Sequence, residues 1–207
     1  MRISELSRIT GLTVPTIKYY IREGLLPAGT AISATQAEYD RAHVDRLRLI
    51  RALVEVGRLS ITTVSELLAT LDAPPDDDPE ERVARAVATA HRALSARPAP
   101  GAPPPERALA AMATLGWQVD PESAALRELE SALTALEMVE LVPGEATLRT
   151  YAGAALTVAE AEVNGVPTAS AAETVRYVVI GTVMYEPVLI ALRRLAQQHV
   201  FSSRPRH

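Results

Sequence analysis

One short segment constrains the fold of this chain more than any other. In the stretch TVPTIKYYIREGLLP, Thr13 can cap a helix, Pro15 suits its first turn, and Gly24 can close its C-terminal end. Ile17 and Ile21 share one side at helical spacing, whereas the flanks and the far side carry polar, mostly basic residues. The segment therefore predicts a short amphipathic helix that packs with one face and leaves the other face open.

A second short helix is predicted immediately before it. Ile3, Leu6 and Ile9 recur at a spacing of three, and residues 10–12 form a brief connection that contains glycine. Two short helices joined by a tight turn are typical of the helix-turn-helix, in which the second helix enters the DNA major groove. Many helical proteins contain such a hairpin, so the pattern alone leaves a purely structural role open.

Further motifs follow in a fixed order along the chain. They are ISEL at Ile3–Leu6, IKYYIREGLLP at Ile17–Pro27, the Tyr39-Asp40 corner, LRLIRAL at Leu47–Leu53, and the Val56-Gly57 turn before Leu59-Ser60-Ile61. Through these motifs the chain resembles the MerR family of bacterial transcription regulators over residues 1–71. The resemblance implies a winged helix-turn-helix domain, with residues 27–39 as a small hairpin wing that touches the adjacent phosphates.

The same resemblance nominates residues that contact DNA. In the family, the paired tyrosines and a basic neighbour on the recognition helix contact the duplex. Many relatives carry an arginine before the wing tyrosine, whereas this chain has Glu38, which would repel phosphate. We therefore expect Arg2 or Arg41 to supply the anchoring charge of the wing. The predicted DNA-binding residues are Arg2, Thr13, Thr16, Lys18, Tyr19, Tyr20, Arg22, Tyr39 and Arg41.

The distribution of charge agrees with this interpretation. The chain has 21 Lys/Arg and 25 Asp/Glu, for a net charge of -4. Residues 1–58 hold nine Lys/Arg against six Asp/Glu, so the acidic excess lies in the rest of the chain. Basic residues are thus concentrated where phosphate would be met. An imbalance of this size is also ordinary for a protein surface, so it supports DNA binding without establishing it.

Two further helices are predicted to complete this domain. Asp40 is a candidate N-cap for a helix over residues 40–56, and Ser60 opens a helix that ends at Leu71. The arginines of the first helix divide into two that could reach backbone phosphate, Arg41 and Arg48, and two that we expect on a solvated face, Arg46 and Arg51.

An acidic, proline-rich linker and a candidate dimerisation helix are predicted at residues 72–97. The linker reads DAPPDDDPEE, and a heptad-like apolar seam follows it. By the resemblance, this helix pairs antiparallel with its twin across a two-fold axis, while packing within the monomer is the alternative. The seam consists of Val83, Val87, Ala90 and Leu94.

The remaining chain is predicted to be helical throughout. Residues 98–105 form a proline-rich linker that excludes a helix, and residues 106–207 form a helical effector or oligomerisation domain. Its periodic segments are residues 105–115, 121–142, 146–163 and 169–201. The expected fold is mainly α, with a winged helix-turn-helix domain, a linking helix and an all-helical C-terminal domain.

The last helix is the best candidate for an effector site. It is apolar on most sides, and Pro187 removes an amide donor beside Glu186, so we expect a kink next to a buried carboxylate. The alternative is that Glu186 points outward or pairs with an arginine, and that the aromatic residues fill cores. The nominated effector-binding residues are Trp117, Tyr151, Tyr177, Tyr185 and Glu186.

Several kinds of chemistry have no support in the sequence. Cysteine is absent, which argues against the thiolate chemistry of soft-metal and redox sensors. The four histidines are scattered without ligand spacing, and no nucleophile motif or glycine-rich phosphate loop is visible. We therefore expect no metal site, no cofactor and no enzymatic activity.

Targeting signals are not visible either. The N-terminal sequence MRISEL lacks a secretory pattern. The longest apolar run, residues 177–192, is interrupted by Glu186 and Pro187 and is shorter than the ~20 residues that a bilayer span requires. A cytoplasmic, nucleoid-associated protein without a membrane partner is expected.

These features together predict a homodimeric MerR-type regulator. Its partners would be double-stranded promoter DNA, a second copy of the chain, RNA polymerase indirectly through the promoter, and a small organic effector bound by the helical domain. In the alternative, the helical domain binds a protein partner or only oligomerises.

Overall fold

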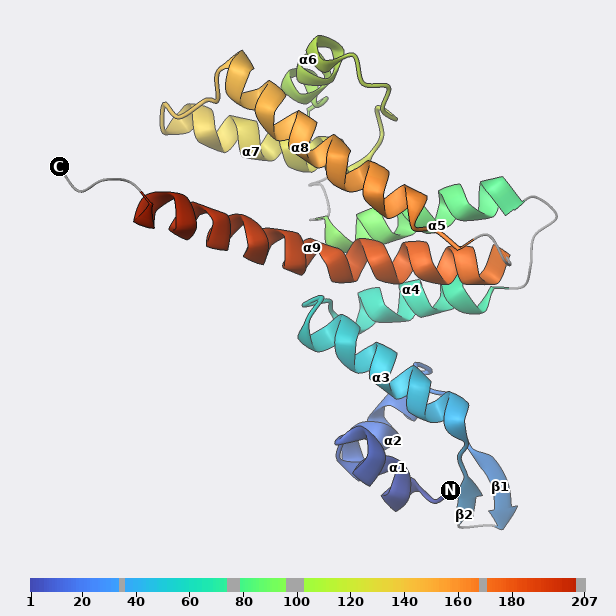
Figure 1. Ribbon diagram of the computed structural model, residues 1–207. Coiled ribbons are helices and arrows are strands. Elements are labelled where there is room, and N and C mark those ends of the chain that lie inside the picture. The colour runs from blue at the N-terminus through green and yellow to red at the C-terminus, as the bar shows by residue number, and fades with distance from the viewer. Residues whose placement is uncertain (34–35, 74–78, 96–102, 168–170, 204–207) are drawn as a thin grey trace. The chain divides into compact units, whose positions relative to one another are not determined.

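The computed structural model describes residues 1–33, 36–73, 79–95, 103–167 and 171–203 of the 207-residue chain (Figure 1). Parts of both predicted linkers, residues 74–78 and 98–102, lie outside the described residues. The described chain is mostly helical, with a small two-stranded antiparallel sheet near the N-terminus. The prediction of a mainly α fold that includes a small hairpin is confirmed.

Local capping signals explain the first two helices. α1 ends where Gly11 adopts the left-handed conformation, with φ of 71°, and donates its N–H to the carbonyl of Ser7. α2 begins after Thr13, whose hydroxyl accepts the N–H of Thr16 at 3.2 Å. The helices span Ile3–Thr10 for α1 and Val14–Arg22 for α2.

The hairpin and two longer helices follow. Asp40 caps α3 by accepting the N–H of His43 at 3.2 Å, and Ser60 caps α4 by accepting the N–H of Thr63 at 3.1 Å. Both caps are the residues that the sequence predicts. The elements are β1 over Thr30–Ser33, β2 over Gln36–Glu38, α3 over Arg41–Glu55 and α4 over Ile61–Asp72.

A single apolar core holds the N-terminal helices together. Its central side chains come from α1, α2, α3, α4 and the segment after α2, and each is no more than 1% exposed. This burial fixes the orientation of α2, because one face of that helix is part of the core. The residues are Leu6, Ile17, Leu25, Leu26, Val44, Leu47, Ile50, Leu53, Val64, Leu67 and Leu68.

The second half of the chain is helical, as predicted. α6 and α7 pack around Ala108, Met112 and Leu126, and α5 also packs against α7. Arg107 of α6 pairs with Glu130 and Glu137 of α7, which joins the same two helices. The helices are α5 over Pro79–Leu94, α6 over Glu106–Leu115, α7 over Ala124–Met138, α8 over Glu145–Asn164 and α9 over Ala171–Ser202.

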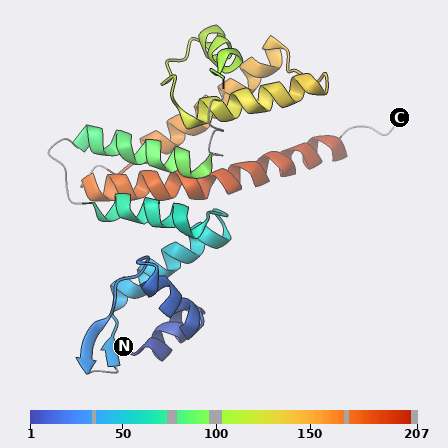
Figure 2. The same cartoon turned by 180° about the vertical axis from the view of Figure 1, so that it is seen from behind.

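The chain divides into two compact units. One contains Met1–Ala73 together with Val183–His207, and the other contains Pro74–Thr182. The 32-residue helix α9 therefore contributes its first part to one unit and its second part to the other (Figures 1 and 2). This division differs from the predicted single domain over residues 106–207, because the sequence pattern of α9 does not reveal which contacts its two ends make.

α9 ends within one residue of the predicted helical segment 169–201, and it is much longer than the apolar run over residues 177–192. Within the described residues, Glu173–Ser202 is a helix that is long and apolar enough to cross a membrane by length and composition alone. The expectation that this region falls short of a span was therefore wrong, because the helix continues through Pro187 to Ser202. Core helices of soluble proteins can meet the same criterion, but they are mostly buried, whereas only 17% of the apolar window of α9 is buried.

Candidate nucleic-acid interface

The recognition helix α2 has one buried and one exposed face, as predicted. Ile17 is fully buried, whereas Lys18 and Arg22 are exposed and Tyr19 is half-buried. Lys18 makes no ion pair with any of the described residues. The helix thus holds two cations on its surface while Ile17 anchors the opposite side in the core.

Contacts within α2 position the exposed side chains. The guanidinium carbon of Arg22 lies 5.2 Å from the ring centroid of Tyr19, and its Nε lies 3.3 Å from Oε1 of Glu23. A guanidinium over an aromatic face is weakly attracted to it, which narrows the range of positions that the arginine samples. The side chain of Arg22 remains 71% exposed and available to a phosphate or a base.

Two of the nominated tyrosines belong to the core instead. Tyr20 and Tyr39 are each only 7% exposed. Burial, followed by the nearby Glu55 carboxylate and Tyr19, raises the pKa of the Tyr20 phenol. The expectation that the rings of both members of the Tyr19-Tyr20 pair lie on the DNA-facing surface is corrected here, since α2 turns Tyr20 inward. Burial of the Tyr39 ring likewise corrects its placement on the surface of the wing.

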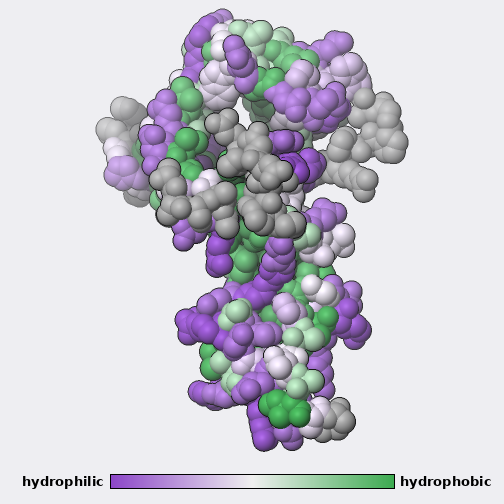
Figure 3. Space-filling view, turned by 90° about the vertical axis from the view of Figure 1, so that its right-hand side faces the viewer, coloured by the Kyte–Doolittle hydropathy of each residue, from purple (hydrophilic) through white to green (hydrophobic). Residues whose placement is uncertain are grey.

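The wing is a short antiparallel hairpin at the predicted place. Thr30 pairs with Glu38 and Ala31 pairs with Ala37. The residues of β1 are all exposed, so this strand offers its side chains to solvent on both faces. Figure 3 shows mostly hydrophilic residues on the displayed face of the N-terminal unit.

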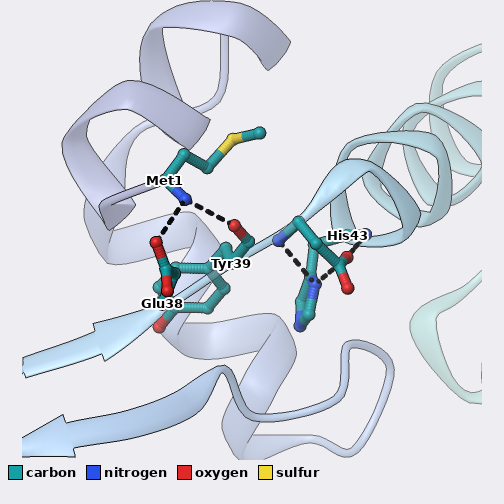
Figure 4. A network of polar contacts seen from close by, with 5 residues as sticks. Met1, Glu38, Tyr39 and His43 are labelled. Carbon is teal, nitrogen blue, oxygen red and sulfur yellow. Dashed lines mark hydrogen bonds and ion pairs between the residues drawn. The ribbon is translucent and has the colours of Figure 1, made fainter.

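The N-terminal residue anchors the wing, a role that the sequence analysis missed. The amino group of Met1 donates to the carbonyl of Tyr39 at 2.6 Å and lies 3.4 Å from Oε1 of Glu38 (Figure 4). The N–H of Tyr39 in turn donates to the carbonyl of Met1 at 2.8 Å. Glu38 therefore sits beside a positive charge, which reduces its repulsion of phosphate. No motif in the sequence signals this contact between distant residues.

Gly29 is required where the chain enters the wing. A Cβ atom at Gly29 would lie 2.6 Å from the carbonyl oxygen of Glu38 and 2.9 Å from the Tyr39 ring. We expect Gly29→Ala to lower the free energy of unfolding by about 1–3 kcal/mol, because backbone and a core ring must move. Urea unfolding measures this change. Gly153→Ala is the control, since nothing lies within 4 Å of an added Cβ there and alanine suits the middle of helix α8, so the free energy of unfolding should not fall.

Arg41 is the first residue of α3 and follows β2 of the wing after two residues in the sequence. Nδ1 of His43 lies 2.7 Å from Oδ1 of Asp40, and this hydrogen bond is the largest cause that lowers the pKa of Asp40. Arg41 is exposed, with its Nε 3.4 Å from Oδ1 of Asp45. Arg2 is exposed at the start of α1. Both arginines remain accessible to phosphate.

Arg46 and Arg51 have structural roles rather than positions on a purely solvated face. Nε of Arg46 donates to the carbonyl of Leu25 at 2.9 Å, and its two terminal nitrogens contact Asp72. Arg51 donates from Nη1 to the carbonyl of Thr10, the last residue of α1. These two arginines hold α2 and α1 in place from α3, which corrects the sequence-based expectation.

The predicted dimerisation seam lies partly inside the monomer. Ala90 is fully buried, whereas Val83, Val87 and Leu94 are half-buried. Oγ of Ser95, just after α5, donates to Glu128 of α7 at 3.0 Å. The alternative of packing within the monomer therefore has direct support at Ala90, which cannot contact a second chain without rearrangement.

The nominated effector residues are spread over both units. Trp117 packs against the Met112 cluster, Tyr151 is 56% exposed on α8, and Tyr177 is half-buried on α9. Tyr185 and Glu186 belong to the other unit, and both are exposed. The expectation of a buried acid at Glu186 was wrong, because Glu186 is exposed, and α9 continues through Pro187 as one helix.

Comparisons with known proteins agree with this architecture. Residues 1–71 match the family described as MerR HTH family regulatory protein. The crystal structure of SCO5550 from Streptomyces coelicolor A3(2), described as a candidate transcriptional regulator, is 34% identical with a TM-score of 0.67. That match covers 99% of this chain and 97% of SCO5550. The chain belongs to the MerR family and is a DNA-binding transcriptional regulator.

Other relatives match only in part. The chain is 45% identical over 56 residues to Nodulation protein NolA of Bradyrhizobium elkanii, and this match covers 26% of NolA. It is 34% identical over 71 residues to the Mercuric resistance operon regulatory protein of Bacillus cereus, and this match covers 53% of that protein. The chain thus spans a quarter to about half of the length of these relatives.

Proposed function

We propose that this regulator binds promoter DNA as a homodimer and changes the shape of the DNA. The observation that carries the proposal is the surface of α2, where Lys18 and Arg22 are exposed while Ile17 fixes the helix in the core. Dimeric helix-turn-helix proteins bind paired half-sites whose symmetry mirrors their own. Two copies of α2 would therefore read a palindromic site.

A change in DNA shape would alter engagement by RNA polymerase. Bending or untwisting a promoter changes the spacing and phasing of its elements, at an energetic cost of ~1–6 kcal/mol. Effector coupling energies are typically ~1–3 kcal/mol, which is comparable. The helical part of the chain can accordingly set the balance between two promoter states. The proposed place of this function is the cytoplasm, at the nucleoid.

A small organic effector is the proposed input to that balance. The chain contains no cysteine, so a soft-metal or thiol-based input has no ligand of the usual kind. Trp117, Tyr151 and Tyr177, which all belong to the unit Pro74–Thr182, stay the proposed contact residues. The second candidate is a protein partner, favoured by the exposed apolar residues Met138 and Leu141 at the end of α7.

Selection of bound fragments from genomic DNA tests the proposal. We expect the wild-type protein to enrich a palindromic sequence, and fluorescence energy transfer between labels at the two ends of that site to change upon binding. Failure to enrich any sequence would contradict specific DNA binding. Enrichment with no change in transfer would contradict the shape change alone.

A further inference from the structure

The second part of α9 carries an apolar face that the described residues of its own chain leave largely accessible to solvent. Six of its side chains are between 42% and 58% exposed. Apolar side chains that gather on one exposed surface mark sites of interaction. These residues, called the α9 seam below, are Tyr185, Val188, Leu189, Leu192, Leu195 and Val200.

The seam is a stripe at coiled-coil spacing. Tyr185, Val188, Leu192 and Leu195 follow one another at steps of three, four and three. With 100° per residue, the whole seam occupies an arc of roughly 140°. Ala196 and His199 fall within the same arc, whereas Ile190 and Phe201 lie outside it.

A different side of α9 serves the interior of the protein. Val175, Val179 and Val183 are at most 1% exposed and recur every four residues. Their stripe lies roughly 130° around the helix from the centre of the seam. No residue of α9 after Val183 is buried among those described. The seam therefore has no part in the buried core and is free for another molecule.

We propose that the α9 seam binds the same seam of a second copy in an antiparallel helix pair. In this arrangement Tyr185 meets Leu195 of the partner subunit, and Val188 meets Leu192 of the partner subunit. An isologous contact of this kind is self-complementary under a two-fold axis. The inference deepens the proposed homodimer by naming its surface, and it rests on that part of the proposed function.

Charges beside the seam select the antiparallel direction. Glu186 and Arg193 are exposed and seven residues apart, so they flank the same side of α9. Antiparallel pairing brings this side of both helices together and places Glu186 near Arg193 of the partner subunit. In a parallel pair, the side that carries Glu186 would instead face the other side of the partner's seam, which carries the apolar residues Met184 and Ala191.

A lipid bilayer is the rival occupant of an apolar helix, and the residues of α9 disfavour it. The part of α9 beyond Val183 contains Glu186, Arg193 and Arg194, and one charged residue at the centre of a span costs about 2.5–3.5 kcal/mol on insertion scales. The earlier part of the helix is committed to the core through its buried valines. A partner helix with an equally narrow apolar stripe therefore fits the seam better than lipid, which would surround α9 on all sides.

Light scattering of the full chain tests the surface. We expect twice the 22.2 kDa mass of one chain for the wild type. Leu192→Glu should weaken the dimer by at least about 30-fold, since it places a carboxylate at the centre of the contact. Gln198→Glu is the control, because it adds the same charge at an exposed position of the same helix, outside both the seam and the buried valine stripe, and it should stay dimeric.

Cysteine cross-linking tests the direction, since the chain has no native cysteine. An oxidised mixture of Tyr185→Cys and Leu195→Cys proteins should form the mixed disulfide. Neither protein alone should cross-link, because like positions lie ~15 Å apart in an antiparallel pair. Self-linking of Tyr185→Cys without the mixed product would overturn the antiparallel arrangement.

The remaining outcomes separate this inference from the proposed function. A Leu192→Glu protein that stays dimeric would overturn the seam as the dimer surface and leave the proposed homodimer standing, whereas a monomeric wild type would overturn both. Binding of the wild type, but not of Leu192→Glu, to phosphatidylcholine vesicles would assign the seam to lipid and overturn it too. Loss of the DNA function would appear separately, as a wild-type protein that enriches no DNA sequence.

Discussion

Tyr20→Ala is expected to lower the free energy of unfolding by about 3–5 kcal/mol, as removal of a large buried ring does in other cores. The ring of Tyr20 is 7% exposed and lies 5.8 Å from that of Tyr19, between centroids. Its loss would leave a cavity beneath the recognition helix. Urea unfolding followed by circular dichroism measures the change.

Tyr20→Phe separates packing from DNA contact. This substitution keeps the ring and removes the phenol oxygen, so we expect a far smaller loss of stability than Tyr20→Ala causes. If the hydroxyl also touches DNA, operator affinity will fall although the protein stays folded. A Tyr20→Ala protein that is as stable as the wild type would show that the ring does not support the core.

Tyr20 illustrates what the sequence of a recognition helix can and cannot reveal. Its family resemblance pointed to a DNA contact, and helical spacing assigned Ile17 to the buried face. The direction of the neighbouring ring depends on how far the core extends around the helix, and Leu25 and Leu26 after α2 enlarge that core. These residues follow the helix, so periodicity within it does not predict their effect.

Features set by neighbouring residues were predictable. Thr13, Asp40 and Ser60 cap their helices as expected, because each cap involves an N–H only three residues away. The ends of the helices follow from such local signals. The hairpin was also placed correctly between the recognition helix and Asp40, but by the resemblance to the MerR family rather than by a local signal.

Features set by distant contacts were not predictable. The sequence pattern predicts Arg46 as a surface residue. Its guanidinium nevertheless donates to the carbonyl of Leu25, 21 residues away, and to Asp72, 26 residues away. The amino group of Met1 reaches Tyr39 across 38 residues. Ala90 likewise fits a dimer seam by spacing and is buried within its own chain. Periodicity identifies an apolar face but not the surface that covers it.

Loss of both cations from the face of α2 is expected to have the largest effect on DNA binding. The double variant Lys18→Ala, Arg22→Ala should weaken operator affinity by about 2–6 kcal/mol if each side chain makes a close contact worth ~1–3 kcal/mol. Two lost phosphate contacts should also reduce the slope of log affinity against log salt by ~1.8. Fluorescence anisotropy at several salt concentrations measures both quantities.

The double variant should fold normally, because both side chains are exposed and the core beneath them is intact. Arg149→Ala is the control, since it removes an exposed, ion-paired arginine from the other unit. If the control weakens binding as much as the double variant, net charge rather than the α2 surface governs affinity. Because a contact to a base leaves the salt slope nearly unchanged, a large affinity loss with a small change in slope would assign these side chains to base recognition.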